Sequence, residues 1–404
     1  MSDWNETSIG NHIDLISGYA FKSGNFLENK VDGALPVIKI KNVANGDVNF
    51  NDVVYHKFDS SLEKFVLSKG DVLIAMTGNH PHAETQVVGD VSKYKLSEKA
   101  LLNQRVGKLV PKGKTDLNFI YYLFKSEDVR FNLANKSSGS ANQANISKGD
   151  ILSLVVKIPS PDEQTAISDV LNSIDNKIDL LNLQNLTLEK MAQTLFRQWF
   201  VEEAKEEWEE VPLESFFDFL EGPGIRNWQY TETGTPFINI RLISNGDINV
   251  SKANYVSNEE ANGKYSHFHL KEDDMIVSTS GTLGNNAIVR KYHLPLLLNT
   301  SVIRFRPKDK KNYSFMYQYL NSKLFQEHLE SAASGSVQAN FGPTHLKAMN
   351  IQKPSLEALE GYAVQADPLY FKLKSNQAQI RTLTVLRDTL IPSLMNNEVT
   401  INTN

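Results

Sequence analysis

Three sets of side chains in the sequence have residue types and spacings that could do chemistry. Asp367–Tyr370 reads DPLY and approximates a D-P-P-Y loop, which orients an exocyclic amine for methyl transfer. Asp162, Asp175 and Lys177 approximate a P-D…D-x-K set, in which carboxylates hold the metal of a nuclease. The sequence also has two H-x-H pairs, a spacing found among metal ligands. These pairs are His80 with His82 and His267 with His269.

None of these sets is complete. In the first, Leu369 replaces the second proline, and no F-x-G-x-G methyl-donor loop accompanies it. In the second, the carboxylates fall on one long helical pattern, which spreads them along a line instead of bringing them together on a metal. The H-x-H pairs have no third ligand nearby. A G-x-x-x-x-G-K-[ST] phosphate loop is also missing. The sequence therefore predicts no catalytic centre and no metal site in this chain.

A long helical pattern lies in the middle of the chain, so the helix must position the segments on either side of it. From Pro161 to Phe200 there is no glycine, and proline occurs only at the start. Apolar residues repeat every seven positions, which is typical of a helix that packs lengthwise on a partner helix. At 1.5 Å per residue this helix would span roughly 55–60 Å. The two seams are Ile167, Ile174, Leu181, Leu188 and Leu195, and Leu171, Ile178, Asn185, Ala192 and Trp199.

The segments on either side of this helix are copies of one another. Four blocks recur in the same order about 200 residues later, which indicates a tandem duplication. The matched blocks are Pro36–Asp47 with Pro236–Asp247, Gly70–Gly78 with Asp273–Gly281, Leu101–Lys112 with Leu297–Lys308, and Ser138–Ile146 with Ser334–Phe341. Within the first copy, we expect strands at Val37–Val43 and Asp71–Met76 and a helix at Asn118–Ala134.

The duplication predicts a second long helix after Pro354, and 3-4 spacing of apolar residues is present there. Its seam is Leu359, Tyr362, Ala366, Leu369, Leu373, Asn376, Ile380, Leu383, Arg387, Leu390 and Leu394. Pro368 predicts a kink, and Asn185 and Asn376 are expected to fix the register. The predicted fold is α/β (α+β): two pseudo-repeated globular domains, at 1–160 and 204–355, separated by helices at 161–203 and 356–404. We expect the helices to form an antiparallel coiled coil.

The loops of both copies carry side chains that suit DNA. Arg, Lys, Asn and Gln read base edges in the major groove, and the cation is kept in the pairs Lys22/Arg226 and Lys41/Arg241. A single loop lysine or asparagine is more often a solvated surface group. Gln143 and Gln338 lie in identical Gln-Ala-Asn stretches, which favours a shared structural or phosphate-gripping role. The candidate DNA-binding residues are Lys22, Lys39, Lys41, Asn42, Asn79, His80, Arg105, Gln143, Arg226, Asn227, Trp228, Gln229, Arg241, Thr282, Asn285, Asn286 and Gln338.

Composition is compatible with this interpretation. The net charge of −5 would argue mildly against a nucleic-acid binder. Six glutamates between Glu202 and Glu210, opposed only by Lys205, account for that charge, so the rest of the chain is near neutral. There are no cysteines, no apolar run of about 18 residues and no signal peptide at the start. We therefore expect a soluble, cytoplasmic protein without disulfides.

The chain resembles the specificity (S) subunit of type I restriction–modification systems over its whole length. Ile158–Ile167 (IPSPDEQTAI) resembles that family's I-P-x-P-x-x-E-Q start of its first conserved helix, and Leu188–Glu202 resembles the end of that helix. Leu386–Val399 resembles the end of the second conserved helix, with Asn397-Glu398 in place of Gly-Glu. The start of the second conserved helix, Lys353–Tyr362, lacks the Glu-Gln pair.

The resemblance implies a non-catalytic DNA-recognition subunit. Each target recognition domain would read one half of a bipartite double-stranded site, and the coiled coil would set the spacer. Two modification subunits would bring S-adenosylmethionine for adenine-N6 methylation, and restriction subunits would bring ATP and Mg²⁺ for cleavage. One other interpretation stays open, a bivalent protein-binding scaffold without a DNA role. DNA methylation by this chain itself fails because the methyl-donor motifs are missing. The target bases do not follow from the sequence.

Overall fold

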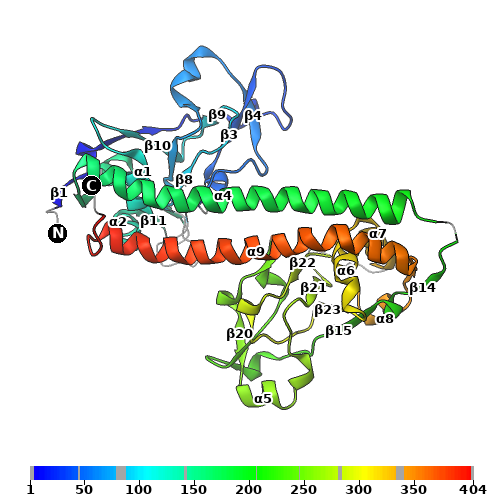
Figure 1. Cartoon of the computed structure of the whole chain (residues 1–404). Coiled ribbons are helices and arrows are strands. Elements are labelled where there is room, and N and C mark those ends of the chain that lie inside the picture. Colours follow the sequence, from blue (N-terminus) through cyan, green and yellow to red (C-terminus); the bar gives the residue numbers. More distant parts are fainter. Residues whose placement is uncertain are drawn as a thin grey trace. The chain divides into compact units, whose positions relative to one another are not determined.

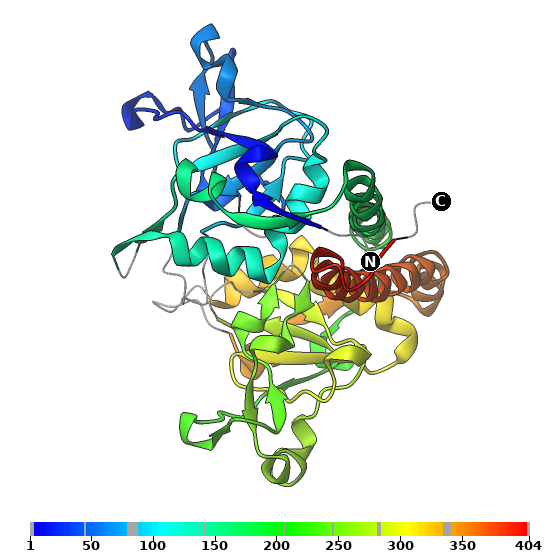
Figure 2. The same ribbon diagram turned by 90° about the vertical axis from the view of Figure 1, so that its left-hand side faces the viewer.

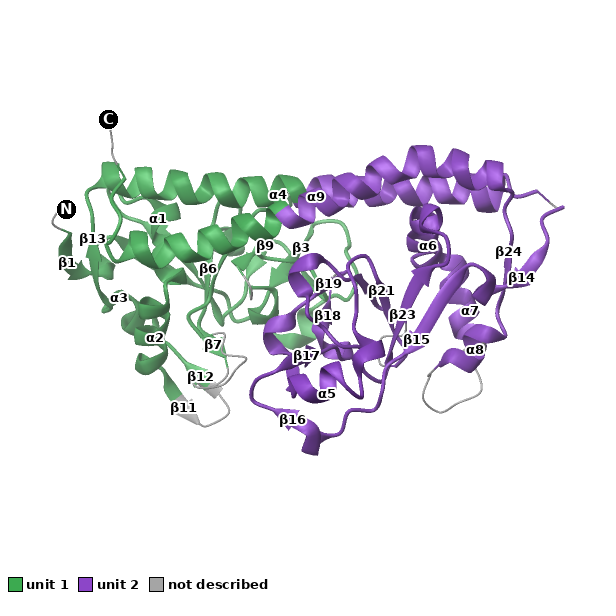
Figure 3. Cartoon of the chain, turned by 60° about the horizontal axis from the view of Figure 1, so that its bottom comes forward, with its two compact units in different colours: residues 1–181, 379–404 green, residues 182–378 purple. Residues whose placement is uncertain are grey.

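The structure is a computed structural model that describes residues 4–43, 46–78, 88–140, 143–205, 207–244, 246–280, 284–333 and 341–401. The chain divides into two compact units, residues 1–181 with 379–404 (unit 1) and residues 182–378 (unit 2) (Figure 3). Each unit combines a globular module with one end of two long helices, α4 (Pro161–Arg197) and α9 (Leu356–Met395). Within the described ranges, no helix is long and apolar enough to cross a membrane.

In the part of the chain that the structure describes, the module of unit 1 is built from small, mostly antiparallel sheets and three short α-helices. Its central sheet has the order β2-β10-β6-β8, and a second sheet has the order β4-β3-β9-β5. The pair β1-β13 and the sheet β11-β12-β7 complete it. The strands are β1 (Asn5–Ser8), β2 (Ile13–Ser17), β3 (Ala34–Ile38), β4 (Val54–Lys57), β5 (Val66–Leu67), β6 (Val72–Ala75), β7 (Thr77–Gly78), β8 (Val91–Lys93), β9 (Ala100–Leu102), β10 (Val106–Pro111), β11 (Ser138–Ser140), β12 (Gln143–Asn145) and β13 (Val155–Ile158). The helices are α1 (Leu117–Lys125), α2 (Glu127–Lys136) and α3 (Lys148–Leu152).

The module of unit 2 repeats this plan. Its central sheet has the order β15-β23-β21-β22, and β14-β24 is the counterpart of β1-β13. Smaller sheets are β16-β20-β17 and β18-β19. The strands are β14 (Glu210–Pro212), β15 (Phe217–Glu221), β16 (Tyr230–Thr231), β17 (Thr235–Phe237), β18 (Ile243–Ser244), β19 (Asp247–Ile248), β20 (Asn254–Val256), β21 (Met275–Ser278), β22 (Asn286–Ile288), β23 (Val302–Pro307) and β24 (Asn350–Gln352). The helices are α5 (Asn258–Asn262), α6 (Tyr313–Leu320), α7 (Lys323–Ala333) and α8 (Pro343–Lys347).

Two local predictions for the first module are wrong in detail. The strand expected at Val37–Val43 ends at Ile38, and the 3₁₀ turn η3 (Ile40–Asn42) follows. The helix expected at Asn118–Ala134 is two helices, because Ser126 takes an extended backbone (φ −63°, ψ 143°) between α1 and α2. The strand expected at Asp71–Met76 is confirmed by β6.

The long helices pack antiparallel within each unit (Figure 1). In unit 2, Asn185 contacts Asn376, and further along α4 Phe196 lies against Tyr362, so residue numbers fall on α9 as they rise on α4. In unit 1, the first turns of α4 lie beside the last turns of α9 (Figure 2), and both share the core of the module. The residues predicted for the coiled coil are all buried or half-buried: Ile167, Ile174, Ile178, Leu181, Asn185, Leu188, Leu195, Leu373, Asn376, Ile380, Leu383 and Leu390.

α9 continues through Pro368, so the proline does not end the helix. Proline lacks the N–H that would bond to the carbonyl four residues earlier, at Val364. Both residues are exposed, so water can hydrogen-bond to that carbonyl. α4 ends differently, in a π-helical turn, η6 (Gln198–Glu202), which places the Phe200 ring 4.9 Å from the Tyr362 ring.

Candidate nucleic-acid interface

Three cation-bearing segments leave the same edge of the unit 1 module. β3 and β9 are parallel neighbours, so Lys39 and Lys41 follow one strand end and Arg105 follows the other. The segment after β2 joins them, because the Tyr19 N–H donates to the Leu102 carbonyl at 2.8 Å. Lys22 follows three residues later. The side chains of Lys22, Lys41 and Arg105 are exposed, as a phosphate or base contact requires.

The unit 2 module has the same arrangement. Ile238, the residue after β17, donates its N–H to the Leu297 carbonyl at 2.8 Å, and the Ile225 N–H donates to Asn299 Oδ1 at 3.2 Å. These bonds bring the segments that carry Arg226 and Arg241 to the same edge. Trp228 is 80% exposed, and Asn227 beside it is also exposed. The duplicated cations therefore hold equivalent places in both modules.

Burial sets Lys39 apart from the other cations. Its Nζ lies 4.2 Å from the centre of the Phe26 ring. Loss of hydration, and then the charge of Lys41, lower the pKa of Lys39. Lys41 itself is 3.6 Å from Asp52, a weak and exposed ion pair.

Two candidate residues are buried and serve the module itself. Asn42 is fully buried, accepts from the Lys39 N–H at 3.1 Å and donates to the Asn51 carbonyl at 2.9 Å. Gln229 is 5% exposed, accepts from the Arg226 N–H and donates to Glu260 and Tyr265. We therefore correct their assignment: these amides hold the cation-bearing loops and do not face a ligand.

The remaining candidates divide by location. Asn79, His80, Thr282 and Gln338 lie outside the described residues, as does the side chain of Gln143. Asn285 donates to the Ile243 carbonyl, and Asn286 donates to Asn321 Oδ1 at 3.1 Å, so both help to line a pocket in unit 2. Among the described residues, no cluster of His, Asp or Glu has the geometry to hold a metal ion.

The module of unit 1 is tied to its helices by a polar network. Asp175 on α4 accepts from the Tyr122 hydroxyl at 2.7 Å and from Arg387 of α9 at 2.9 Å. Burial would raise the pKa of Asp175, but these two donors outweigh it and leave the pKa lowered. Lys95 binds Asp179 of α4 at 2.7 Å. No sequence pattern predicts this network, although Asp175 and Arg387 lie on the predicted helices.

Unit 2 ties its module to its helices with the charges reversed. Residue 374 is the counterpart of residue 179, but it is a lysine and binds Asp273 at 2.8 Å. Residue 370, the counterpart of Asp175, is a tyrosine whose hydroxyl donates to Gln318 at 2.8 Å. Arg290 adds two bonds to Gln377 of α9, at 2.7 and 3.0 Å. Equivalent positions of the long helices thus hold the module in both units, but the side chains at these positions differ.

Comparison with known proteins decides the family. The model of the type I restriction modification DNA specificity domain matches residues 1–190 and 205–380. The chain belongs to this family. The match covers both modules, in agreement with the duplication in sequence and strand order.

Two relatives match over nearly their full length. The MjaIX specificity subunit of Methanocaldococcus jannaschii is 24% identical over 91% of this chain and 90% of its own. The HindI specificity subunit of Haemophilus influenzae is 22% identical over 99% of this chain and 100% of its own. The crystal structure of the type I S subunit from M. genitalium superposes with a TM-score of 0.58 at 19% identity, covering 99% of this chain and 97% of that one. This likeness shows the same fold.

Proposed function

We propose that this chain is the DNA-recognition subunit of a type I restriction–modification complex and that each module reads one half of a bipartite site. The observation that carries the proposal is the duplication, because the two modules share a strand order and hold Lys22 and Lys41, or Arg226 and Arg241, at the same edge. Two similar readers in one chain suit a target with two different halves.

In this proposal the exposed cations bind phosphates and position each module, and a few groove contacts select the sequence. Each base pair read would contribute about 1–3 kcal/mol of discrimination. One half-site of a few base pairs is therefore weakly selective. Linking the two modules makes the second binding event intramolecular, so the two selectivities multiply.

We further propose that α4 and α9 set the spacer between the half-sites and present a surface to two modification subunits. The chain would take no catalytic step. S-adenosylmethionine would be bound by the modification subunits for adenine-N6 methylation, and ATP with Mg²⁺ by the restriction subunits. This division of labour agrees with a sequence that carries no complete methyl-donor or phosphate-binding motif.

Methylome sequencing of host cells tests the proposal. Replacing residues 1–159 with the equivalent module of a relative should change one half of the methylated motif and leave the other half and the spacer intact. A motif that changes in both halves, or in neither, would contradict independent reading. Binding of the assembled complex to DNA should also weaken steeply with salt, whereas a scaffold that binds only proteins would show no DNA binding to weaken.

A further inference from the structure

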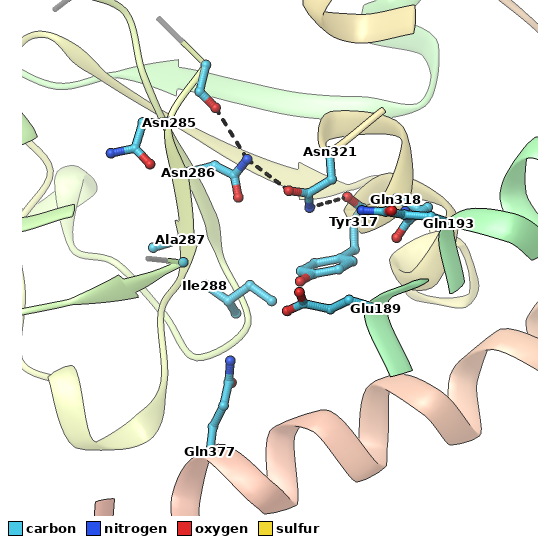
Figure 4. A pocket seen from close by; sticks show the side chains of 12 residues that line it. Glu189, Gln193, Asn285, Asn286, Ala287, Ile288, Tyr317, Gln318, Asn321 and Gln377 are labelled. Carbon is cyan, nitrogen blue, oxygen red and sulfur yellow. Dashed lines mark hydrogen bonds between the residues drawn. The ribbon is translucent and has the colours of Figure 1, made fainter. Parts of the chain in front are cut away.

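A polar pocket of about 330 Å³ lies in unit 2, among α4, α6, β22 and α9 (Figure 4). Twelve residues line it, and Glu189 of α4 is the one charged residue among them. Most of the others are amides: Gln193, Asn285, Asn286, Gln318, Asn321 and Gln377. The pocket lies on the helix side of the module and includes none of the exposed cations described above.

Glu189 is half-buried, and within the described part of the chain its carboxylate accepts no hydrogen bond and forms no ion pair. Burial raises its pKa. Arg290 is not among the residues that line the pocket, and its guanidinium is bound to Gln377 and to Asp273. A desolvated carboxylate without a cation is unfavourable, and that cost is recovered when a cation docks beside it.

The neighbouring groups favour a planar donor. Asn285 and Asn286 use their N–H groups inside the protein, on Ile243, Gly284 and Asn321, so their oxygens remain available as acceptors. Figure 4 shows the Asn286 oxygen and the Glu189 carboxylate directed into the pocket, with the Tyr317 ring beside the carboxylate. A carboxylate fork, an amide oxygen and an aromatic face together match a guanidinium group.

We propose that this pocket receives the side chain of an arginine from a partner polypeptide. An arginine donates two parallel hydrogen bonds to one carboxylate and stacks on a ring, whereas lysine is a point charge that does neither. A nucleic-acid phosphate is excluded by the charge of Glu189. The backbone of the arginine stays outside, because the described residues of the lining include no cation to hold a free α-carboxylate. The pocket includes none of the candidate cations, so arginine binding here is independent of which bases the modules read.

Capped arginine is the probe that tests this inference on the full chain. Ligand-detected NMR should show saturable binding of N-acetyl-L-arginine amide, with a Kd in the millimolar range for a single side chain. N-acetyl-L-citrulline amide has nearly the same shape without the charge, and it should bind at least tenfold more weakly. Free L-arginine should bind more weakly than the capped form, and adenosine should not compete with it.

Glu189→Gln is the decisive variant, because it keeps the shape of the side chain and removes its charge. It should lose binding of the arginine probe at least tenfold. Since the variant also removes a desolvated charge, its thermal unfolding midpoint should not fall. Glu357→Gln, at an exposed position of α9, is the matched control and should bind as the unchanged chain does. Equal binding of arginine and citrulline, competition by adenosine, or full binding by Glu189→Gln would each overturn the inference.

Discussion

Gly18 and Gly222 occupy equivalent places where a single methyl group would collide with the backbone. A Cβ at Gly18 would lie 2.1 Å from the Asn103 carbonyl oxygen, and one at Gly222 would lie 2.4 Å from the backbone of Asn299. Neither glycine has the positive φ that favours glycine elsewhere, so the constraint is close approach. We predict that Gly18→Ala or Gly222→Ala lowers the free energy of unfolding by about 1–3 kcal/mol, as measured by denaturant titration.

Each module contains its own control for this substitution. Gly24 and Gly224 lie a few residues further on, and a Cβ at either would meet no atom within 4 Å. Alanine at these two positions should change the unfolding free energy by less than about 0.5 kcal/mol. Equal effects at Gly18 and Gly24 would show that close approach is not what requires glycine.

Arg387 provides a second prediction at the residue scale. Its guanidinium binds Asp175, and side-chain exposures of 18% and 11% make this a largely buried pair. Arg387→Met would leave the Asp175 carboxylate buried without its cation. At pH 7 we expect a loss of about 3–5 kcal/mol in unfolding free energy. Lys372→Met, at an exposed position of the same helix, should change little.

The pH dependence of this loss follows from the pKa of Asp175. In the folded chain that pKa lies below its ordinary value of 3.8. The unchanged chain therefore gains stability from the pair above pH 3.8, and loses it as the pH falls through the lowered folded pKa. In Arg387→Met the guanidinium no longer opposes the effect of burial, so we expect a higher pKa for Asp175 and protonation that relieves the buried charge. The difference between the two chains should shrink as the pH falls from 7 toward 4, and a constant difference would contradict this account.

At the scale of elements, the seam of the two helices contains an asymmetric amide pair. Asn376 is 1% exposed and donates to Asn185 Oδ1 at 2.8 Å and to Gln184 Oε1 at 2.9 Å, whereas Asn185 is only half-buried. Asn185→Leu should therefore cost about 1–3 kcal/mol, because it leaves a buried amide short of an acceptor. Asn376→Leu should cost less, since water can reach Asn185.

The double variant separates the pair from its surroundings. Replacing both asparagines with leucine removes the polar groups together, so the thermal unfolding midpoint should return to or exceed that of the unchanged chain. Asn182→Leu, at an exposed position of α4, controls for added apolar surface. If both single variants cost the same and the double variant costs their sum, the amides do not act as a pair.

The long helices were predictable because their signal is local and repeated. The seven-residue apolar repeat occurs several times between Ile167 and Leu195. α4 begins at Pro161, where the glycine-free stretch begins. The break at Ser126 was not predictable, because apolar residues continue across it and only packing in the module selects two helices. Asn42 was misassigned for a related reason. Its amide type suits DNA, but its burial depends on Lys39 and Asn51, whose approach is a tertiary property.

At the scale of the whole molecule, the duplication predicted the shared fold of the two modules but not how each module is attached to its helices. It implied equal modules, and the strand orders β2-β10-β6-β8 and β15-β23-β21-β22 agree. It did not imply that the attachments of the modules to their helices differ. Asp179 and Lys374 hold equivalent positions with opposite charges, and each finds a partner of the complementary sign in its own unit. In each half of the chain, the charge on the helix and the charge on the module have thus stayed complementary while the halves diverged.

The proposed spacer role gives a prediction for the assembled complex. Removing the facing heptads 182–188 and 373–379 would shorten both helices by about 10 Å while keeping the apolar seam in phase. On DNA that length corresponds to about three base pairs. Arg381 would then take the place of Lys374 and keep a cation opposite Asp273. Methylome sequencing should find both half-sequences unchanged and the spacer between them shorter by about three base pairs. An unchanged spacer in an active complex would show that the helices do not measure the distance, and changed half-sequences would show that the modules were disturbed.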